Sequence, residues 1–173
     1  MIKIRTATLT DAKPLSELAE KTFCDAFASS NNADDITSHC ASNFGEAIQA
    51  AVLSDSQYDT LVAEDNGKLV AYAQLRQGQC PECVTAKSAG EIQRLYVDKL
   101  WHGKGLAQSL MVESINRLTR KNNDVVWLGV WEHNPRAIAF YKKFNFQPVG
   151  KHIFKLGGDP QTDIIMMRKI KTE

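Results

Sequence analysis

The stretch from Glu91 to Met111 constrains the fold more than any other part of the chain. An apolar strand pattern from Ile92 to Val97 leads into a short loop, then into Gly103 and Gly105, and then into an amphipathic helix pattern. The first N–H groups of a helix have no partner within the helix and carry partial positive charge. Because glycine lacks a Cβ atom, a ligand can approach its backbone closely. The stretch therefore predicts a turn that binds a phosphate or pyrophosphate group.

Two familiar nucleotide motifs do not fit this turn. A dinucleotide fingerprint requires Gly or Ala three residues after its second glycine, and Gln108 stands there. A P-loop requires Ser or Thr after its Gly-Lys pair, but Gly105 follows Lys104. A helix that simply begins after a glycine turn remains the alternative interpretation.

A second block lies downstream of this helix pattern. Residues 125–130 have the apolar composition of a buried strand, and a helix pattern runs from Arg136 to Phe146. Asn134 is a good N-cap residue, and Pro135 is favoured in the first turn of a helix. Together the blocks predict two successive strand–helix units.

The two blocks resemble motifs A and B of the GCN5-related N-acetyltransferases, the GNAT superfamily. Motif A reads Gln/Arg-x-x-Gly-x-Gly/Ala, and the chain follows it at Gly105 and Ala107 but has His102 at the first position. Motif B is matched by a set of four residues, which are Asn134, Ala137, Tyr141 and Phe146. Asn145 replaces the usual glycine, and asparagine tolerates the same left-handed C-cap conformation.

The resemblance implies a mixed α/β fold, with a largely antiparallel sheet of about seven strands, about four flanking helices and splayed central strands. Residues 1–173 are expected to form a single N-acetyltransferase domain, as their length also suggests. Asn66 and Gly67 predict a tight hairpin turn. The polar run 29–35 reads as a loop, and a helix is expected over Glu46 to Leu53, with a further turn before it.

The resemblance also implies that acetyl-CoA is the co-substrate. The backbone N–H groups of Leu95, Tyr96 and Val97 are expected to hold its pantetheine arm and its carbonyl oxygen. The pyrophosphate is expected at the turn, on His102, Gly103, Lys104, Gly105, Leu106, Ala107 and Gln108. Asn134 matches an asparagine that contacts the cofactor arm, and a role as helix N-cap alone is the alternative.

Acetyl transfer to an amine requires an uncharged nitrogen and a proton for the departing thiolate. Tyr141 matches the frequent general acid of the family and also contacts the cofactor, unless it is only a core aromatic residue. Glu91 matches the glutamate used as a base by histone-type members, and it is four residues before Leu95, so both side chains are expected on one side of the strand. A solvated strand-end residue is the alternative. Some N-terminal acetyltransferases use a glutamate at the position of Gly129.

The acceptor is expected to be a small amine. Lys21 to Phe27, Trp127 to Glu132 and Gln161 to Met166 resemble PaiA-type bacterial polyamine acetyltransferases. A polyamine needs apolar walls and carboxylates. Phe27, Tyr72, Trp131 and Glu132 are the expected acceptor residues, with Asp25, Asp34 and Asp35 as further sources of charge. A protein or peptide acetyltransferase and a non-catalytic CoA-binding regulatory module are the alternatives.

The composition of the chain limits the kinds of partner that it is expected to bind. The formal net charge of +1, without a basic block, argues against a nucleic-acid partner. No apolar run is long enough to span a membrane, and no signal-peptide pattern begins the chain, so a cytoplasmic location is expected. The sequence leaves open whether the chain forms a homodimer.

The four cysteines are expected to be free thiols, without a bound metal. Cys80 and Cys83 have the spacing of a zinc knuckle, which Cys24, Cys40 and His39 would have to complete. No second C-x-x-C pair exists, so the zinc site and a local disulfide are the weaker hypotheses.

Overall fold

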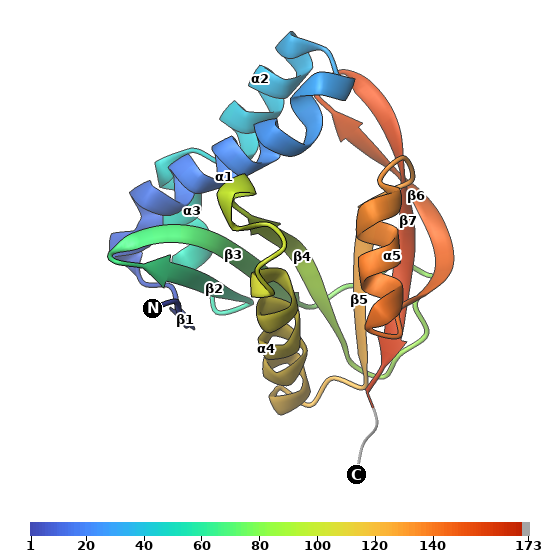
Figure 1. Ribbon diagram of the computed structural model, residues 1–173. Helices are drawn as coiled ribbons and strands as arrows, with labels where there is room; N and C mark the ends of the chain where they lie inside the picture. Colours follow the sequence, from blue (N-terminus) through green and yellow to red (C-terminus); the bar gives the residue numbers. More distant parts are fainter. Residues whose placement is uncertain (171–173) are drawn as a thin grey trace.

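The computed structural model describes residues 1–170, which form one seven-stranded sheet with helices on both faces (Figure 1). The strands are β1 (Lys3–Thr6), β2 (Tyr58–Asp65), β3 (Lys68–Gln77), β4 (Ala89–Val97), β5 (Val125–Trp131), β6 (Gln147–Leu156) and β7 (Asp159–Lys169). The helices are α1 (Ala12–Phe27), α2 (Ala33–Asn43), α3 (Glu46–Ser54), α4 (Leu106–Arg120) and α5 (Pro135–Lys143). None of these helices has the length and hydropathy to cross a membrane.

The sheet order is β1-β2-β3-β4-β5-β7-β6, and every neighbouring pair is antiparallel except β4 and β5. These two strands are joined through α4, as parallel neighbours must be by a long crossover. They pair only from Ala89 to Glu91, opposite Val125 to Trp127, and then diverge (Figure 1). The predicted mixed, largely antiparallel sheet with splayed central strands is confirmed.

The core lies on both faces of the sheet. On one face, α4 and α5 pack against alternate residues of the strands, including Leu61, Ala73 and Val126. On the other face, α1 and α2 pack against residues that include Val62 and Tyr72. Alternation along β2 thus places Leu61 and Val62 in different clusters, because successive side chains of a strand point to opposite faces.

Local sequence explains several element boundaries. Asn66 and Gly67 both have positive φ, 49° and 81°, as the two-residue turn between β2 and β3 requires. The Asn134 side chain accepts a hydrogen bond from the Ala137 N–H at 3.1 Å, so it caps α5 as predicted. Asn145 has a φ of 64°, in the left-handed conformation that it was expected to tolerate.

Helix α2 corrects the sequence interpretation, which assigned residues 29–35 to a loop and only a turn to the residues between this loop and Glu46. The helix begins at Ala33, where the Asn32 side chain accepts from the Asp34 N–H at 2.8 Å. It buries Ile36 and Cys40, one helical turn apart. Acidic residues in a first turn are favoured by the helix dipole, so a polar composition concealed a helix start, and residues 1–170 contain five α-helices.

A bulge in β4 corrects the expectation that Glu91 and Leu95 lie on one side. Gln74 pairs with Arg94 while Leu75 pairs with Ile92, so one residue of β4 is left unpaired between them. Such a residue inverts the alternation of the strand. Leu95 therefore packs in the α4 cluster, and Glu91 contacts Arg76 on the other face.

Candidate active site

The diverging part of β4 exposes backbone donors toward β5. Asp98 donates its N–H to the Val70 oxygen at 2.8 Å, and hydrogen-bonded pairs alternate along antiparallel strands. In this register Tyr96 is the next residue that bonds to β3, so its N–H is used within the sheet. The N–H groups of Leu95 and Val97 point the other way, where β5 is no longer paired. Two of the three expected donors are therefore available, and the Tyr96 N–H is not.

The glycine turn leads directly into α4. Gly103 and Gly105 have φ values of 75° and 79°, which side chains other than glycine rarely adopt. Gly105 is the N-cap of α4 and supplies no side-chain acceptor, so the first N–H groups of the helix, from Leu106 onward, lack a capping partner. The turn thus combines the glycine backbone and the helix start that favour an anion.

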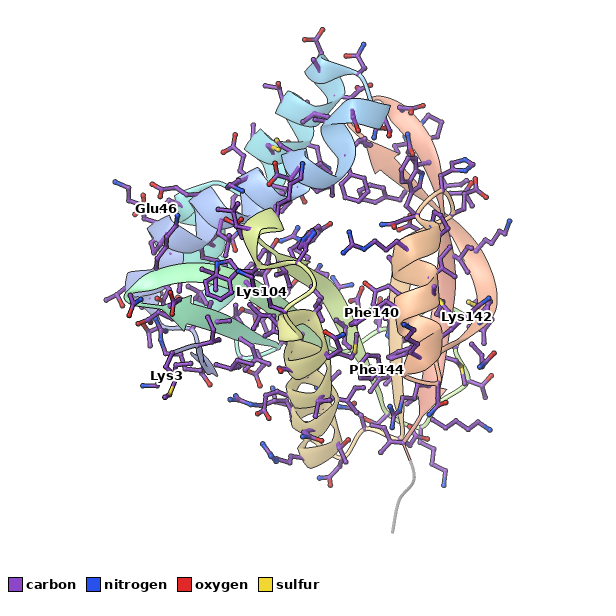
Figure 2. All side chains as sticks on the ribbon, viewed as in Figure 1. Lys3, Glu46, Lys104, Phe140, Lys142 and Phe144 are labelled. Carbon is purple, nitrogen blue, oxygen red and sulfur yellow. The ribbon has the colours of Figure 1, made fainter. Side chains whose placement is uncertain are left out.

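Two side chains stabilise this turn. The His102 Nε2 atom lies 2.9 Å from the Val97 oxygen, which ties the turn to the end of β4. The Lys104 ammonium lies 4.6 Å from the centre of the Trp101 ring, and Figure 2 shows Lys104 near the start of α4. His102 therefore holds the backbone, while Lys104 places a positive charge beside the donors of the helix.

Tyr141 lies on α5 and packs against the cluster beneath α4. Burial raises the pKa of its phenol to about 12, so the hydroxyl stays protonated at neutral pH. The Tyr141 ring meets Phe146 edge to face, with ring centres 6.1 Å apart. Figure 2 shows Phe140 and Phe144 of the same helix on the side toward α4. Tyr141 is thus a protonated donor within an apolar layer.

Glu91 sits at the last paired position between β4 and β5. It is 9% exposed, and its Oε2 atom lies 2.7 Å from both Nε and Nη2 of Arg76. Burial raises the pKa of Glu91, while Arg76 acts in the opposite direction. The carboxylate is held by a guanidinium, whose two N–H groups already occupy its Oε2 atom.

The expected acceptor residues come together only in part. Phe27 of α1 and Trp131 of β5 meet edge to face, with ring centres 5.8 Å apart. Next to Trp131, Glu132 lies 3.6 Å from the Lys151 ammonium. Tyr72, in contrast, is 0% exposed and stacks on Tyr96 within the α1 cluster. The expectation that Tyr72 lines the acceptor site was wrong, because its strand position turns it into the core.

Three polar residues on the same face had not been recognised from the sequence. Asp163 of β7 and His152 of β6 are paired in register, and Asp163 also lies opposite Trp131 of β5. Arg94 of β4 lies 4.9 Å from the centre of the Phe44 ring. The available signal was an acid, Asp163, directly before the apolar run Ile164 to Met167, but its neighbours depend on strand order.

The cysteines form two separate pairs. Cys24 and Cys40 join α1 and α2, with their sulfur atoms 3.9 Å apart. Cys80 and Cys83 pack in another cluster, around Val84. Across residues 1–170, no group of three or more His, Cys, Asp or Glu side chains is arranged to hold a metal ion. The two pairs therefore do not combine into the zinc site that the sequence left open.

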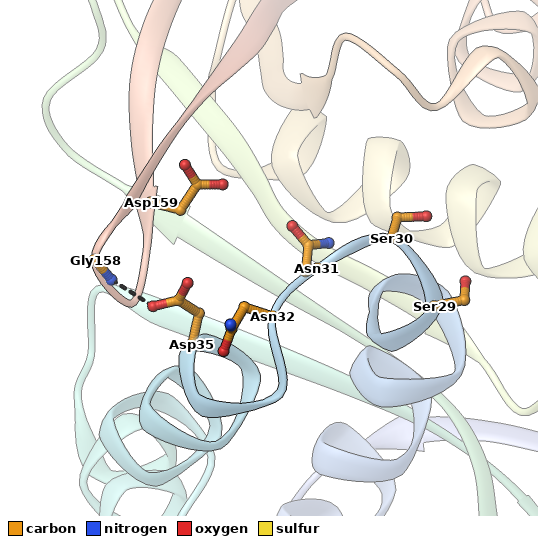
Figure 3. Close-up of a pocket in the computed structure, with 7 residues that line it drawn as sticks. All are labelled: Ser29, Ser30, Asn31, Asn32, Asp35, Gly158 and Asp159. Atoms are coloured by element: carbon orange, nitrogen blue, oxygen red, sulfur yellow. Dashed lines mark hydrogen bonds between the residues drawn. The ribbon is translucent and has the colours of Figure 1, made fainter.

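An open polar depression of about 690 Å³ lies between the start of α2 and the β6–β7 turn (Figure 3). Its lining is Ser29, Ser30, Asn31, Asn32, Asp35, Gly158 and Asp159. Within it, Asp35 accepts from the Gly158 N–H at 2.8 Å, which joins α2 to the hairpin. The lining includes neither the glycine turn nor Tyr141, so this depression is not where the donors and the phenol meet.

Comparison with known proteins places this arrangement in context. The model of the acetyltransferase (GNAT) family matches residues 18–146. An uncharacterised N-acetyltransferase of Mycobacterium tuberculosis (strain H37Rv) is 32% identical over 162 residues, which cover 94% of this chain and 99% of the relative.

Two solved structures show the same fold. PaiA N-acetyltransferase from Thermoplasma acidophilum, in complex with coenzyme A, is 21% identical, with a TM-score of 0.76 over 98% of this chain and 99% of that one. The ribosomal-protein-S18-alanine N-acetyltransferase from Escherichia coli is 19% identical, with a TM-score of 0.70 over 100% and 96% of the two chains.

Proposed function

The chain belongs to the acetyltransferase (GNAT) family, and on that premise we propose that it acetylates the primary amine of a small molecule, with a polyamine as the first acceptor to test. It is an acetyl-CoA-dependent N-acetyltransferase. What remains to be assigned is the role of each residue and the chemical class of the acceptor.

One observation carries the assignment of the acetyl-CoA site. The β4 strand has no β5 partner beyond Glu91, and this unpaired stretch leads into the strand-to-helix turn that contains Gly103 and Gly105. Free N–H groups of Leu95 and Val97 suit the amide-containing pantetheine arm. The uncapped start of α4 suits the pyrophosphate, and Lys104 adds a positive charge beside it. The donors of β4 therefore suit the pantetheine arm of acetyl-CoA, and the start of α4 with Lys104 suits its pyrophosphate.

In this proposal Tyr141 gives a proton to the departing CoA thiolate. Its raised pKa keeps the phenol protonated before the reaction, as an acid must be. Asn134 accepts from the Ala137 N–H through Oδ1, which leaves its side-chain NH₂ group free for the cofactor arm. The cap and the cofactor contact are therefore compatible in one side chain.

The acceptor side supports an amine with apolar segments. Phe27 and Trp131 provide an aromatic corner that suits methylene groups, and Glu132 supplies a carboxylate beside it. Asp25 and Asp35 are occupied by Lys21 and by the Gly158 N–H. The polyamine class therefore rests on the resemblance to PaiA-type enzymes and on this corner, rather than on a ring of free carboxylates.

Arg94 favours a second class of acceptor, one that carries an anionic group besides its amine. Its guanidinium donates to the Gln74 and Asn43 side-chain oxygens, at 2.8 and 3.3 Å, which are both neutral. Within residues 1–170, its side-chain partners are these two amides and the Phe44 ring, and none of them is a carboxylate. An amino acid or a peptide could therefore place its carboxylate near Arg94.

Thiol release from acetyl-CoA tests the proposal across these classes. The panel comprises spermidine, spermine, simple monoamines, free amino acids and short peptides, each with the purified protein. We expect amine-dependent release that is fastest with a polyamine, and mass spectrometry should show the N-acetyl product. If polyamines leave the rate at background while amino acids or peptides raise it, the acceptor class passes to the second candidate.

A further inference from the structure

Gly129 leaves room for two side chains from neighbouring strands. Along β5, Leu128 and Val130 point into the α4 cluster, so Gly129 faces the opposite side, toward the acceptor residues. A Cβ atom added at Gly129 would lie 3.2 Å from the Asp163 Oδ2 atom and 3.5 Å from the His152 Cε1 atom. The space that a side chain at position 129 would occupy is therefore filled by a carboxylate and an imidazole.

Asp163 and His152 form a cross-strand pair. They are in register between β7 and β6, and the His152 Nε2 atom lies 3.8 Å from the Asp163 Oδ2 atom. The side chain of Asp163 is 17% exposed and that of His152 is 40% exposed. A largely buried carboxylate thus lies beside an imidazole that is more exposed to solvent.

The other charged groups on this face have partners other than Asp163. From β4 and β3, Glu91 is held by Arg76, and Arg94 is held by amide oxygens. From β6, Lys151 lies near Glu132 instead. Among residues 1–170, His152 is the only basic side chain within ion-pair distance of the Asp163 carboxylate. Burial raises the pKa of Asp163, whereas His152 acts in the opposite direction.

Asp163 is also near the residues assigned to the reaction. It lies opposite Trp131 in the register of β5 and β7. Trp131 in turn packs edge to face on Phe27 of α1. Asp163 therefore lies among the residues assigned to the acceptor, on β7 beside β5.

We propose that Asp163 receives the ammonium group of the acceptor and, with His152, removes the proton that makes the nitrogen nucleophilic. This inference rests on the proposed acetyl transfer. The first proton passes from nitrogen to Asp163 and leaves through His152. The nitrogen lone pair then forms the C–N bond, the C–S bond breaks, and Tyr141 protonates the thiolate. The second nitrogen proton replaces the one that Tyr141 gave to the thiolate. One proton is therefore released to solvent for each acetyl group transferred.

The test compares Asp163→Asn with Asp159→Asn, a matched change of an exposed carboxylate on the same strand. For Asp163→Asn we expect kcat/KM for the amine to fall roughly 100-fold at pH 7, with an unchanged Kd for acetyl-CoA by calorimetry. His152→Gln should cause a smaller loss, and Asp159→Asn should cause none. Glu91→Gln should cost less than Asp163→Asn, because Glu91 already binds Arg76.

The pH profile separates a base from a merely structural residue. With Asp163 present, kcat/KM should rise as this carboxyl loses its proton and then level off. In Asp163→Asn it should keep rising toward the pKa of the free amine, near ~10, because only uncharged amine reacts. A variant with the wild-type profile and rate would overturn the inference. An inactive wild-type protein with every amine would instead overturn the proposed function.

Discussion

Tyr141 gives the sharpest prediction at the scale of single residues. Replacing it with Phe removes the hydroxyl but keeps the ring that packs in the α4 cluster. We expect kcat to fall roughly 100-fold, because the thiolate then leaves unprotonated, while the Kd for acetyl-CoA changes little. Steady-state kinetics and calorimetry measure the two quantities.

Tyr72→Phe is the matched control for this change. It removes a hydroxyl from a tyrosine that is fully buried in the α1 cluster. It should leave kcat unchanged. Because the pKa of Tyr141 is raised to about 12, the wild-type enzyme should also show no alkaline loss from this group at pH 8 to 10. A Tyr141→Phe variant with wild-type kcat would remove Tyr141 as the acid.

The glycine turn gives a second prediction, about affinity. His102→Ala removes a side chain that bonds to the Val97 oxygen, so it should weaken acetyl-CoA binding only modestly. Gly105→Val should weaken it at least about tenfold, because a β-branched residue at φ 79° costs roughly 1–2 kcal/mol and covers the donors. Calorimetric Kd values rank the variants.

Gly67→Val provides the control for backbone strain. Gly67 has a φ of 81°, and a Cβ atom there would meet nothing within 4 Å, as at Gly105. This hairpin variant should lower stability similarly and leave the Kd for acetyl-CoA unchanged. If His102→Ala weakens binding more than Gly105→Val, the turn does not bind mainly through its backbone.

At this scale the sequence predicts what is contiguous along the chain. Asn134 lies three residues before Ala137, so its cap was predictable, and so was the need for glycine at position 105. The pairing of Asp163 with His152, by contrast, depends on the register of two strands. Tyr72 was misassigned for the same reason, because the face that a strand residue occupies is set by its partners.

At the scale of elements, Asn134 tests whether one side chain serves both α5 and the cofactor. Asn134→Ala should lower the free energy of unfolding by about 1 kcal/mol, because the Ala137 N–H loses its acceptor. It should also weaken acetyl-CoA binding. Asn134→Ser restores a cap acceptor without the amide NH₂ group, so it should recover stability but not affinity. Chemical denaturation and calorimetry measure the two effects. Equal recovery of both would reduce Asn134 to a helix cap.

The elements also show where local patterns fail. The β2–β3 hairpin and α5 follow from their turn and cap residues, whose conformational needs are local. Helix α2 was missed because its polar first turn resembles a loop, although Ile36 and Cys40 have helical spacing. The β4 bulge has no sequence signature, since it arises from the pairing of Gln74 with Arg94. It decides that Glu91 faces Arg76 rather than the side of Leu95.

At the scale of the whole molecule, the loss of pairing between β4 and β5 joins the two halves of the proposed reaction. One face carries α4 and α5 with the turn and Tyr141, and the other carries α1 with Phe27 and Asp163 beside Trp131. A continuous sheet would separate these faces. The diverging strands bring backbone donors, phenol and carboxylate to one region without any of them being adjacent in sequence.

The stability of the whole fold should depend on pH through Asp11. Arg5 of β1 binds both Asp11 oxygens, at 2.8 and 2.9 Å, and joins the first strand to the start of α1. The Arg5 hydrogen bond lowers the pKa of Asp11 from 3.8 to about 2. A lowered carboxyl pKa stabilises the fold above the unfolded value, and this contribution is lost as the pH falls from near 4 through 2.

Asp11→Asn should therefore lower the free energy of unfolding by roughly 2 kcal/mol at pH 7, since each pKa unit corresponds to about 1.4 kcal/mol. Denaturant unfolding across pH measures the effect, with Glu17→Gln, an exposed change on the same helix, as the control. The difference between Asp11→Asn and wild type should shrink as the pH falls from 4 to 2, because wild-type Asp11 becomes protonated there. A difference that stays constant over this range would mean that Asp11 acts through packing or capping rather than through its charge.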